Sequence, residues 1–210
     1  MWFDKPPTSS SWLAARKHLR RDPVLRPIIE RVGPCTLAPR RDYFVVLCKS
    51  IFTQQISTRI ATVLFNRFRD NFPQRRPTPA RVIELLNGDA ELIRRCGLSR
   101  QKQSYLLDLS HRFVAGQIPT RRFARMSDEQ VIESLVQVKG IGRWTGEMFL
   151  ILVLNRPDVL PVDDLGVREA ARKFYGLAER PRSAELTALG EQWRPWRTIA
   201  TWYLWRGLSV

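Results

Sequence analysis

Two glycines that flank one apolar residue, Gly140-Ile141-Gly142, constrain the fold of this chain more than any other feature. Helical spacing of apolar residues precedes them, after the capping pair Ser127 and Gln130, and resumes as far as Asn155. Because glycine tolerates backbone conformations that other residues avoid, the tripeptide predicts a sharp turn between two helices. Residues 136–145, Val-Gln-Val-Lys-Gly-Ile-Gly-Arg-Trp-Thr, are therefore interpreted as a helix-hairpin-helix connection.

The rest of the chain also predicts helices, and no strand pair or Asn-Gly hairpin is recognisable. Polar residues from Thr53 to Ser57 interrupt the helical pattern that begins at Asp42, so two helices are expected to meet near Gln54 and Gln55. An all-α fold follows from these patterns. The other helices expected are 12–21, 22–32, one opened by Thr78 and Pro79, one opened by Asp89, 99–115, one capped by Asp163 and ending at Tyr175, 183–193 and 195–206.

The chain carries a large excess of positive charge. Its 210 residues include 35 Lys plus Arg against 20 Asp plus Glu, which gives a formal net charge of +15. This balance favours a polyanionic partner, although an arginine-rich composition also arises from genome-wide usage. A hydrophobic fraction of 44%, with seven Trp, supplies enough apolar surface for a folded core.

Cysteine and histidine usage excludes several kinds of site. Cys35, Cys48 and Cys96 are scattered, so they predict neither a disulfide framework nor a four-cysteine zinc or iron-sulfur site. His18 and His111 are too few for a His-rich metal site. No signal peptide or membrane-spanning run is recognisable, and a cytoplasmic protein that joins the nucleoid by binding DNA is expected. Of the kinds of site considered, the one that remains uses carboxylates without a metal.

The backbone amides of the Gly-x-Gly turn, with those that open the next helix, suit an anion such as a DNA phosphate. Lys139 and Arg143 flank the turn and add positive charge. Such a turn would hold the DNA backbone without reading its sequence. An ordinary glycine-rich loop is the alternative interpretation of the tripeptide taken alone.

Two adjacent acids, Asp163 and Asp164, follow a proline-bounded loop, and Asp164 lies 22 positions beyond Gly142. Acids at a helix start ordinarily cap it, which accounts for Asp163. A second carboxylate near a DNA-binding turn would be repelled by the polyanion, so its presence indicates chemistry. It could stabilise the positive charge on a sugar ring whose base departs and orient a water for attack.

Residues 135–145 and 160–168 together resemble the HhH-GPD superfamily of DNA glycosylases, which joins a helix-hairpin-helix, a Gly/Pro-rich loop and an aspartate. Phe-Thr-Gln-Gln-Ile-Ser at 52–57 and Trp-Arg-Pro-Trp-Arg at 193–197 are similar to its 3-methyladenine-DNA glycosylase II family. The resemblance implies one glycosylase core over residues 1–210, with two helical lobes and a DNA-binding cleft between them. One lobe would span 43–155, with its hairpin at 136–145, and the other 1–42 plus 156–210.

The resemblance also implies an activity and a partner. Members excise alkylated bases such as 3-methyladenine and 7-methylguanine from duplex DNA by base flipping and hydrolysis, which leaves an abasic site. A monomer that binds DNA and no membrane is expected. The implied residues are catalytic Asp164; base-pocket Trp144, Trp205 and Met148; DNA-binding Gln54, Gln55, Ile56, Ser57, Lys139, Gly140, Ile141, Gly142, Arg143 and Thr145; and the carbonyls of Val136, Val138 and Gly140 for a structural Na⁺ or K⁺.

Departures from the family pattern bear on mechanism and substrate range. Bifunctional relatives place a Schiff-base lysine two residues after the second hairpin glycine, where this chain has Trp144, and the iron-sulfur cysteines of another branch are absent. A monofunctional hydrolase without a required cofactor is therefore expected. Met148 stands where some relatives have an aromatic pocket residue, and Lys139 where proline is usual. Trp193, Trp196 and Trp202 are assigned to core packing.

Two other functions remain compatible with the residues. A non-catalytic protein could use the hairpin only to bind distorted or damaged DNA, and it would tolerate neutralisation of Asp164. A glycosylase that also cleaves the strand would require an unexpected lysine, which borohydride would trap on abasic DNA.

Overall fold

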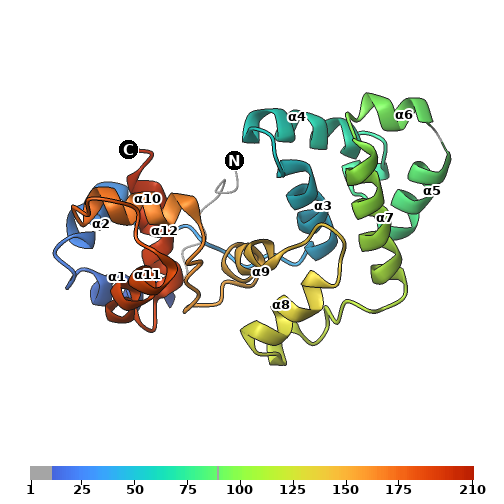
Figure 1. The fold of residues 1–210 in the computed structure, drawn as a ribbon. Helices are drawn as coiled ribbons and strands as arrows, with labels where there is room; N and C mark the ends of the chain where they lie inside the picture. The colour runs from blue at the N-terminus through green and yellow to red at the C-terminus, as the bar shows by residue number, and fades with distance from the viewer. Residues whose placement is uncertain (1–10, 89) are drawn as a thin grey trace. The chain divides into compact units, whose positions relative to one another are not determined.

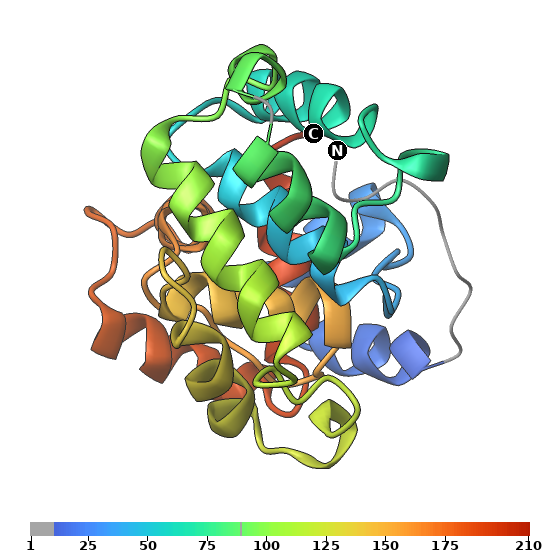
Figure 2. The same ribbon diagram turned by 90° about the vertical axis from the view of Figure 1, so that its right-hand side faces the viewer.

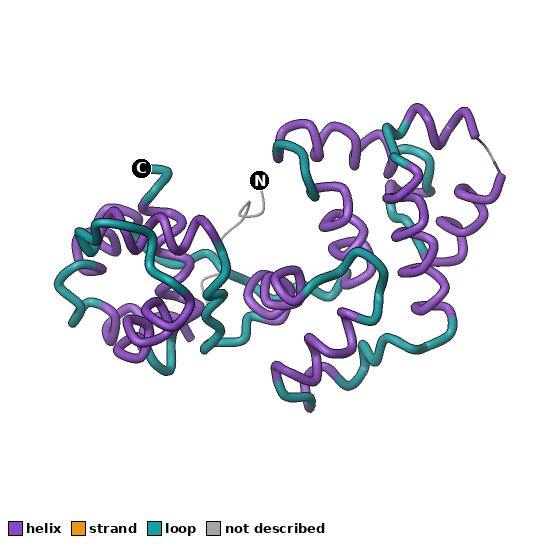
Figure 3. The backbone as a smooth tube through the Cα atoms, viewed as in Figure 1, coloured by secondary structure: helices purple, strands orange, loops and turns teal. Residues whose placement is uncertain are grey.

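Helices form all the regular secondary structure of residues 11–88 and 90–210, the part of the chain that this computed structural model describes. Figures 1 and 3 show those helices and the loops that join them. The all-α prediction is confirmed. None of the helices in these two ranges has an apolar stretch long enough to cross a bilayer.

The chain divides into two compact units, a continuous one of residues 41–146 and a discontinuous one of residues 1–40 plus 147–210. The sequence predicts a boundary after residue 155, whereas the structure changes unit after Gly146, within α9 (Arg143–Phe149). A helix keeps its amphipathic pattern across such a point, so the sequence gives no sign of the change. Residues 1–10, and Asp89 as a helix start, lie outside the described residues.

The continuous unit is organised around α7 (Arg100–Val114), which packs against α3 (Tyr43–Thr53) and α5 (Pro79–Gly88). Figure 2 shows α7 as the yellow-green helix at the front, beside α5. The core is rich in aromatic rings: Phe52 contacts Phe65 and Phe68 with ring centroids 5.3 and 5.1 Å apart. The other elements of this unit are α4 (Thr58–Arg69), η1 (Pro73–Arg75), α6 (Ala90–Arg95), η2 (Phe123–Arg125) and α8 (Asp128–Val136).

Serine side chains begin three helices of the continuous unit. Ser57 starts α4 and Ser99 starts α7, and each hydroxyl accepts the backbone N–H three residues on. Ser127 and Gln130 form the predicted capping box at the start of α8, with each side chain accepting the other's backbone N–H. The caps at Ser99 and Ser127 confirm the helix starts predicted at these two positions.

The discontinuous unit packs around α12 (Arg197–Gly207), which is buried along most of its length. α12 contacts α1 (Ser11–Leu19), α2 (Leu25–Val32) and α10 (Leu165–Phe174). Trp193 and Trp202 are 0% and 2% exposed, and Trp196 packs edge-on against Trp12, so the assignment of these indoles to packing is confirmed. The other elements are the π-helix η3 (Leu150–Leu154), α11 (Ser183–Gly190) and η4 (Glu191–Trp193).

A buried carboxylate joins the beginning of the chain to its end in this unit. Asp22, 7% exposed, accepts hydrogen bonds from the Tyr175 hydroxyl (2.5 Å) and the Trp193 indole (3.1 Å). Its other oxygen accepts the backbone N–H groups of Val24 and Leu25, at the start of α2. Burial and the Asp22 charge raise the pKa of Tyr175. Residues 11–40 thus complete the core of the discontinuous unit.

Replacement of Asp22 by Ala should lower the free energy of unfolding by about 3 kcal/mol, because the buried Trp193 indole, the partly buried Tyr175 hydroxyl and two helix N–H groups would lose their acceptor. Urea denaturation measures this change. Glu30→Ala is the control, since it removes an exposed carboxylate that pairs with Arg20 at 2.8 Å, and should cost below about 1 kcal/mol. Equal losses in the two variants would contradict the role given to Asp22.

Candidate active site and nucleic-acid interface

The loop Gln54–Ser57 separates α3 from α4, where the sequence predicts a break. Gln55 has a φ of 61°, a left-handed conformation that costs a residue other than glycine about 1 kcal/mol or more. Gln55 and Ser57 are exposed, and Ile56, the predicted wedge, is half-buried. Contacts with neighbouring residues must therefore stabilise the backbone of this loop.

Two side chains hold this loop. The Lys102 ammonium on α7 donates to the carbonyls of Phe52 and Gln54, each at 2.9 Å, at the C-terminal end of α3. Partial burial lowers the pKa of Lys102, and the helix carbonyls supply a favourable site for its charge. The Gln54 amide donates to the carbonyl of Gly140 at 2.8 Å. The loop is thus tied both to α7 and to the hairpin turn.

The hairpin turn between α8 and α9 requires glycine at its first position. Gly140 has a φ of 79°, and a Cβ there would lie 2.2 Å from the Tyr105 ring. Ile141 points inward, 4% exposed, and its N–H donates to the Val138 carbonyl at 3.0 Å. A Cβ on Gly142 would meet nothing within 4 Å. The first glycine permits contact with α7, and the second leaves open space at the surface.

A carboxylate on α7 holds the residue before the turn. Asp108 accepts the Lys139 backbone N–H at 2.9 Å and the Arg112 guanidinium at 3.0 Å. Partial burial opposes the charge on Asp108, but these hydrogen bonds outweigh it, and the pKa of Asp108 falls below its usual value. The Lys139 side chain is exposed, on a backbone that α7 fixes.

The first turn of α9 contains the amides predicted to bind a phosphate. The first N–H groups of a helix have no acceptor within it, so they are available to an anion or a cap. The Thr145 side chain is buried at 7% exposure, so a DNA contact from this residue would come from its backbone. The Arg143 guanidinium binds both carboxylate oxygens of Glu129, at 2.7 and 2.8 Å, which lowers the pKa of Glu129. Arg143 therefore adds less net charge to the turn than the sequence implies.

The three carbonyls predicted to bind a monovalent cation lie around the same turn. Val138 O accepts the Ile141 N–H, and Gly140 O accepts the Gln54 amide. A carbonyl oxygen has two lone pairs, so each can still face a cation while it accepts one hydrogen bond. With Val136 O, the donor set consists of neutral oxygens, which suits Na⁺ or K⁺.

The candidate catalytic carboxylate begins α10. Asp164 is 8% exposed, and its Oδ1 accepts the Val167 N–H at 2.8 Å and the Trp205 indole N–H at 2.9 Å. The prediction that Asp163 caps this helix is wrong, since Asp164 is the N-cap. Asp163 is exposed and accepts the Ser183 hydroxyl at 2.7 Å, because the preceding turn ends one residue later than the sequence suggests.

A glycine allows the close approach of Asp164 and Trp205. A Cβ on Gly166 would lie 3.1 Å from Asp164 Oδ1 and 3.3 Å from the Trp205 indole nitrogen. The family resemblance implies that Trp205 is a wall of the base pocket, and in the structure its indole also donates a hydrogen bond to the carboxylate. Trp205 thus restricts the orientation of Asp164.

The Trp-Arg-Pro-Trp-Arg segment holds the loop that precedes Asp164. Arg197, with a side chain 15% exposed, binds both carboxylate oxygens of Asp158, at 2.7 and 3.1 Å. The Thr198 hydroxyl donates to the Arg156 carbonyl and accepts the Val159 N–H. These contacts connect the start of α12 to residues 156–159, so this segment positions the loop.

The two remaining predicted pocket residues both lie on α9. Trp144 is 48% exposed, the most exposed of the tryptophans in the described part of the chain, and belongs to the continuous unit. Met148 is half-buried and belongs to the discontinuous unit, with Asp164 and Trp205. An exposed indole at the start of a helix provides a flat apolar surface for a base.

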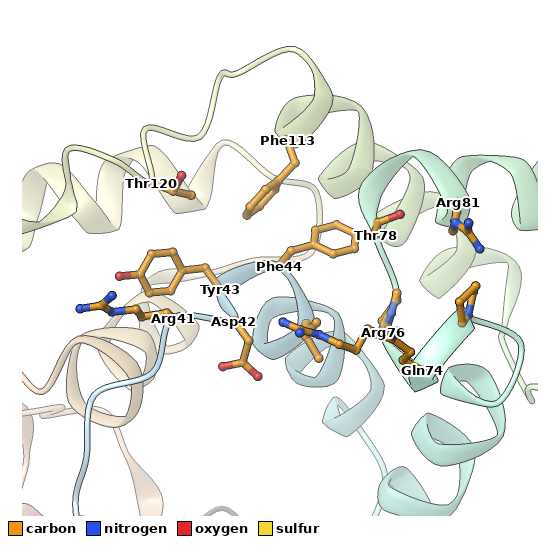
Figure 4. Close-up of a pocket in the computed structure, with 13 residues that line it drawn as sticks. Arg41, Asp42, Tyr43, Phe44, Gln74, Arg76, Thr78, Arg81, Phe113 and Thr120 are labelled. Carbon is orange, nitrogen blue, oxygen red and sulfur yellow. The ribbon is translucent and has the colours of Figure 1, made fainter.

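A cavity of about 570 Å³ lies in the continuous unit and contains none of the predicted site residues. Figure 4 shows Phe44 and Phe113 near its middle. Arg41 and Arg81 lie at opposite sides of the view, and their guanidinium groups do not converge.

A family model described as "HhH-GPD superfamily base excision DNA repair protein" matches residues 48–195, which include the loop, the hairpin turn and Asp164. This chain belongs to the HhH-GPD superfamily. The match covers more than half of the chain and includes residues of both units. The superfamily resemblance and the all-helical HhH-GPD fold are confirmed.

Several named proteins are similar in sequence to this HhH-GPD protein. The alkylbase DNA glycosidase-like protein mag2 of Schizosaccharomyces pombe is 33% identical over 207 residues, 94% of each chain. DNA-3-methyladenine glycosylase 1 of the same yeast is 38% identical over 169 residues, 80% of this chain and 73% of that protein. A solved structure of S. pombe 3-methyladenine DNA glycosylase (Mag1) in complex with abasic DNA superimposes with a TM-score of 0.82 at 35% identity, over 94% of this chain and 97% of that one.

The two hairpin glycines provide a matched test of the turn. Gly140→Ala should lower the free energy of unfolding by about 2 kcal/mol or more, because its Cβ would overlap the Tyr105 ring in a left-handed backbone. Gly142→Ala should change it by less than about 0.5 kcal/mol, since its Cβ would enter open space. Urea denaturation of both variants measures the difference. Similar values for the two would show that the turn does not depend on its contact with α7.

Proposed function

We propose that this HhH-GPD protein is a DNA glycosylase that hydrolyses the N-glycosidic bond of alkylated bases in duplex DNA and leaves an abasic site. The observation that carries the proposal is Asp164, a buried carboxylate held at the start of α10 by the Trp205 indole and a helix amide. Relatives named as 3-methyladenine-DNA glycosylases support the substrate class. Purines methylated at N3 or N7, such as 3-methyladenine and 7-methylguanine, are the proposed substrates.

Asp164 acts on the sugar in this mechanism. The N-glycosidic bond breaks and its electron pair leaves with the base, so positive charge develops on the sugar ring. The Asp164 carboxylate stabilises that charge and orients a water whose oxygen bonds to C1′, and the proton of the water is released through the carboxylate to solvent. A purine methylated at N3 or N7 is cationic and departs as a neutral base, so the reaction requires no strong general acid.

The loop and the exposed indole account for base extrusion. A base must leave the stack before its glycosidic bond can be reached, at a cost of a few kcal/mol. Ile56 enters the space left by the extruded nucleotide, with Gln54, Gln55 and Ser57 beside it. Trp144 and Trp205 attract a cationic methylpurine through cation–π contact, worth on the order of 2 kcal/mol when desolvated. Met148 has no aromatic ring, so the pocket is less aromatic than it would be with Trp or Tyr at this position.

The hairpin turn binds the DNA backbone in this proposal. Amides of the Gly140–Gly142 turn and of the first turn of α9 hold a phosphate, and the Lys139 side chain adds charge. A Na⁺ or K⁺ at the carbonyls of Val136, Val138 and Gly140 supplies positive charge that supports the turn. No cofactor takes part in the hydrolysis itself.

The mechanism is monofunctional, since Trp144 occupies the position at which bifunctional relatives place a lysine. A non-catalytic damage-binding protein and a glycosylase with strand-cleaving activity are the competing functions. The protein is further proposed to act as a monomer in the cytoplasm, in association with the nucleoid.

Replacement of Asp164 by Asn should abolish release of methylated purines from alkylated duplex DNA, with a loss of about a thousandfold or more, because the amide lacks the negative charge. Chromatographic detection of the free base measures the release. Asp163→Asn is the matched control, since it changes the neighbouring exposed carboxylate, and it should remain active. No release by the wild-type protein, with DNA binding retained, would favour the non-catalytic alternative.

Strand nicking is followed in the same samples, and borohydride is added with abasic DNA to trap any covalent intermediate. A trapped complex would establish the strand-cleaving alternative. Neither nicking nor trapping is expected.

Trp205→Phe should lower the rate of base release about tenfold while it preserves an aromatic wall, because Asp164 loses one of its hydrogen-bond donors. Trp202→Phe is the control, since it changes an indole of the core that does not bind the carboxylate. Single-turnover kinetics at saturating enzyme measure the two rates. A Trp205→Phe rate equal to that of the wild type would reduce Trp205 to a stacking surface.

A further inference from the structure

One side of α7 contacts both elements that are proposed to bind DNA. Lys102, Tyr105 and Asp108 are three residues apart and therefore neighbours on the helix surface. Lys102 binds the carbonyls that lead into the Gln54–Ser57 loop, Tyr105 lies against Gly140, and Asp108 accepts the Lys139 N–H. A single rigid helix thus fixes the spacing between the loop and the turn.

We propose that Lys102 is a positioning residue for base extrusion. It holds the Gln54–Ser57 loop at a fixed place relative to the hairpin turn, so that the wedge meets the base stack while the turn holds a phosphate. This inference rests on the glycosylase function proposed above.

The environment of Lys102 supports a positioning role. A surface lysine ordinarily keeps its ammonium in water, whereas this ammonium is partly buried and bound to two carbonyls at 2.9 Å. Those carbonyls end α3, where the helix dipole favours a cation. The next residue, Gln55, has a left-handed backbone that must be stabilised from outside. Loss of the ammonium would remove the donor that holds this end of the helix.

A second hydrogen bond joins the Gln54–Ser57 loop to the hairpin turn. The Gln54 amide donates to the Gly140 carbonyl at 2.8 Å, so the loop and the turn also contact each other directly. The turn retains Tyr105 and Asp108 when Lys102 is changed. A Lys102 variant should therefore no longer hold Ile56 in position, but its hairpin turn should still bind phosphate. Because these two effects can be measured separately, the inference can be tested.

The test compares two duplexes that carry the same 7-methylguanine, one with cytosine opposite the lesion and one with an abasic analogue opposite it. Extrusion of an unpaired lesion costs less, so it depends less on the wedge. With saturating enzyme under single-turnover conditions, Lys102→Met should lower the rate of base release about tenfold on the paired lesion and at most about twofold on the unpaired lesion. The salt dependence of affinity for undamaged duplex should remain that of the wild type.

Three further variants sharpen the result. Lys102→Arg should recover most of the paired-lesion rate, because its guanidinium can donate to both carbonyls. Lys17→Met removes one exposed charge from α1 and should match the wild type on both duplexes. Gln54→Leu removes the second contact without loss of a charge and should also slow release from the paired lesion more than from the unpaired one.

Two outcomes would overturn the inference. Equal losses on both duplexes would mean that Lys102 serves only general stability, and an unchanged rate on the paired lesion would mean that the loop holds its position without it. Failure of the wild-type protein to release base from either duplex would instead reject the proposed glycosylase function. The duplex with the unpaired lesion thus distinguishes a variant with a misplaced Ile56 from an inactive enzyme.

Discussion

The contact between the Gly140 backbone and the Tyr105 ring is the constraint on which the continuous unit depends. It requires a residue without a Cβ and with a left-handed backbone, and it brings the hairpin turn directly onto α7. The neighbouring hydrogen bond from Lys139 N–H to Asp108 then fixes the direction in which the chain enters the turn. Glycine here serves packing, and the open space at Gly142 leaves the outer surface of the turn accessible.

Asp164 combines a structural role with the chemical role proposed for it. As the N-cap of α10 it accepts a helix amide, and the Trp205 indole fixes the same oxygen. A carboxylate held in this way is oriented before any substrate arrives, which lowers the reorganisation that a developing charge would otherwise demand. The Arg197 and Asp158 pair secures the loop that leads to it. The candidate catalytic carboxylate is thus held by contacts that also stabilise the fold.

Local signals in the sequence predicted the local features of the structure. The capping box at Ser127, the break at Gln54 and the Gly-x-Gly turn each depend on residues close together in the chain, and all three are present. The choice between Asp163 and Asp164 as cap was wrong because it depends on where a turn ends. Pairings across long stretches of chain, such as Lys102 with the end of α3 or Trp205 with Asp164, leave no local pattern.

The division of the chain into a continuous and a discontinuous unit has a consequence for biosynthesis. Residues 41–146 form one unit without a break and can fold as soon as they emerge from the ribosome. Residues 11–40, by contrast, must wait for residues 147–210, since Asp22 can bind Tyr175 and Trp193 only after those residues have been synthesised. A nascent chain that ends before residue 147 carries the hairpin turn but neither Asp164 nor Trp205, so the candidate catalytic carboxylate is assembled after the turn.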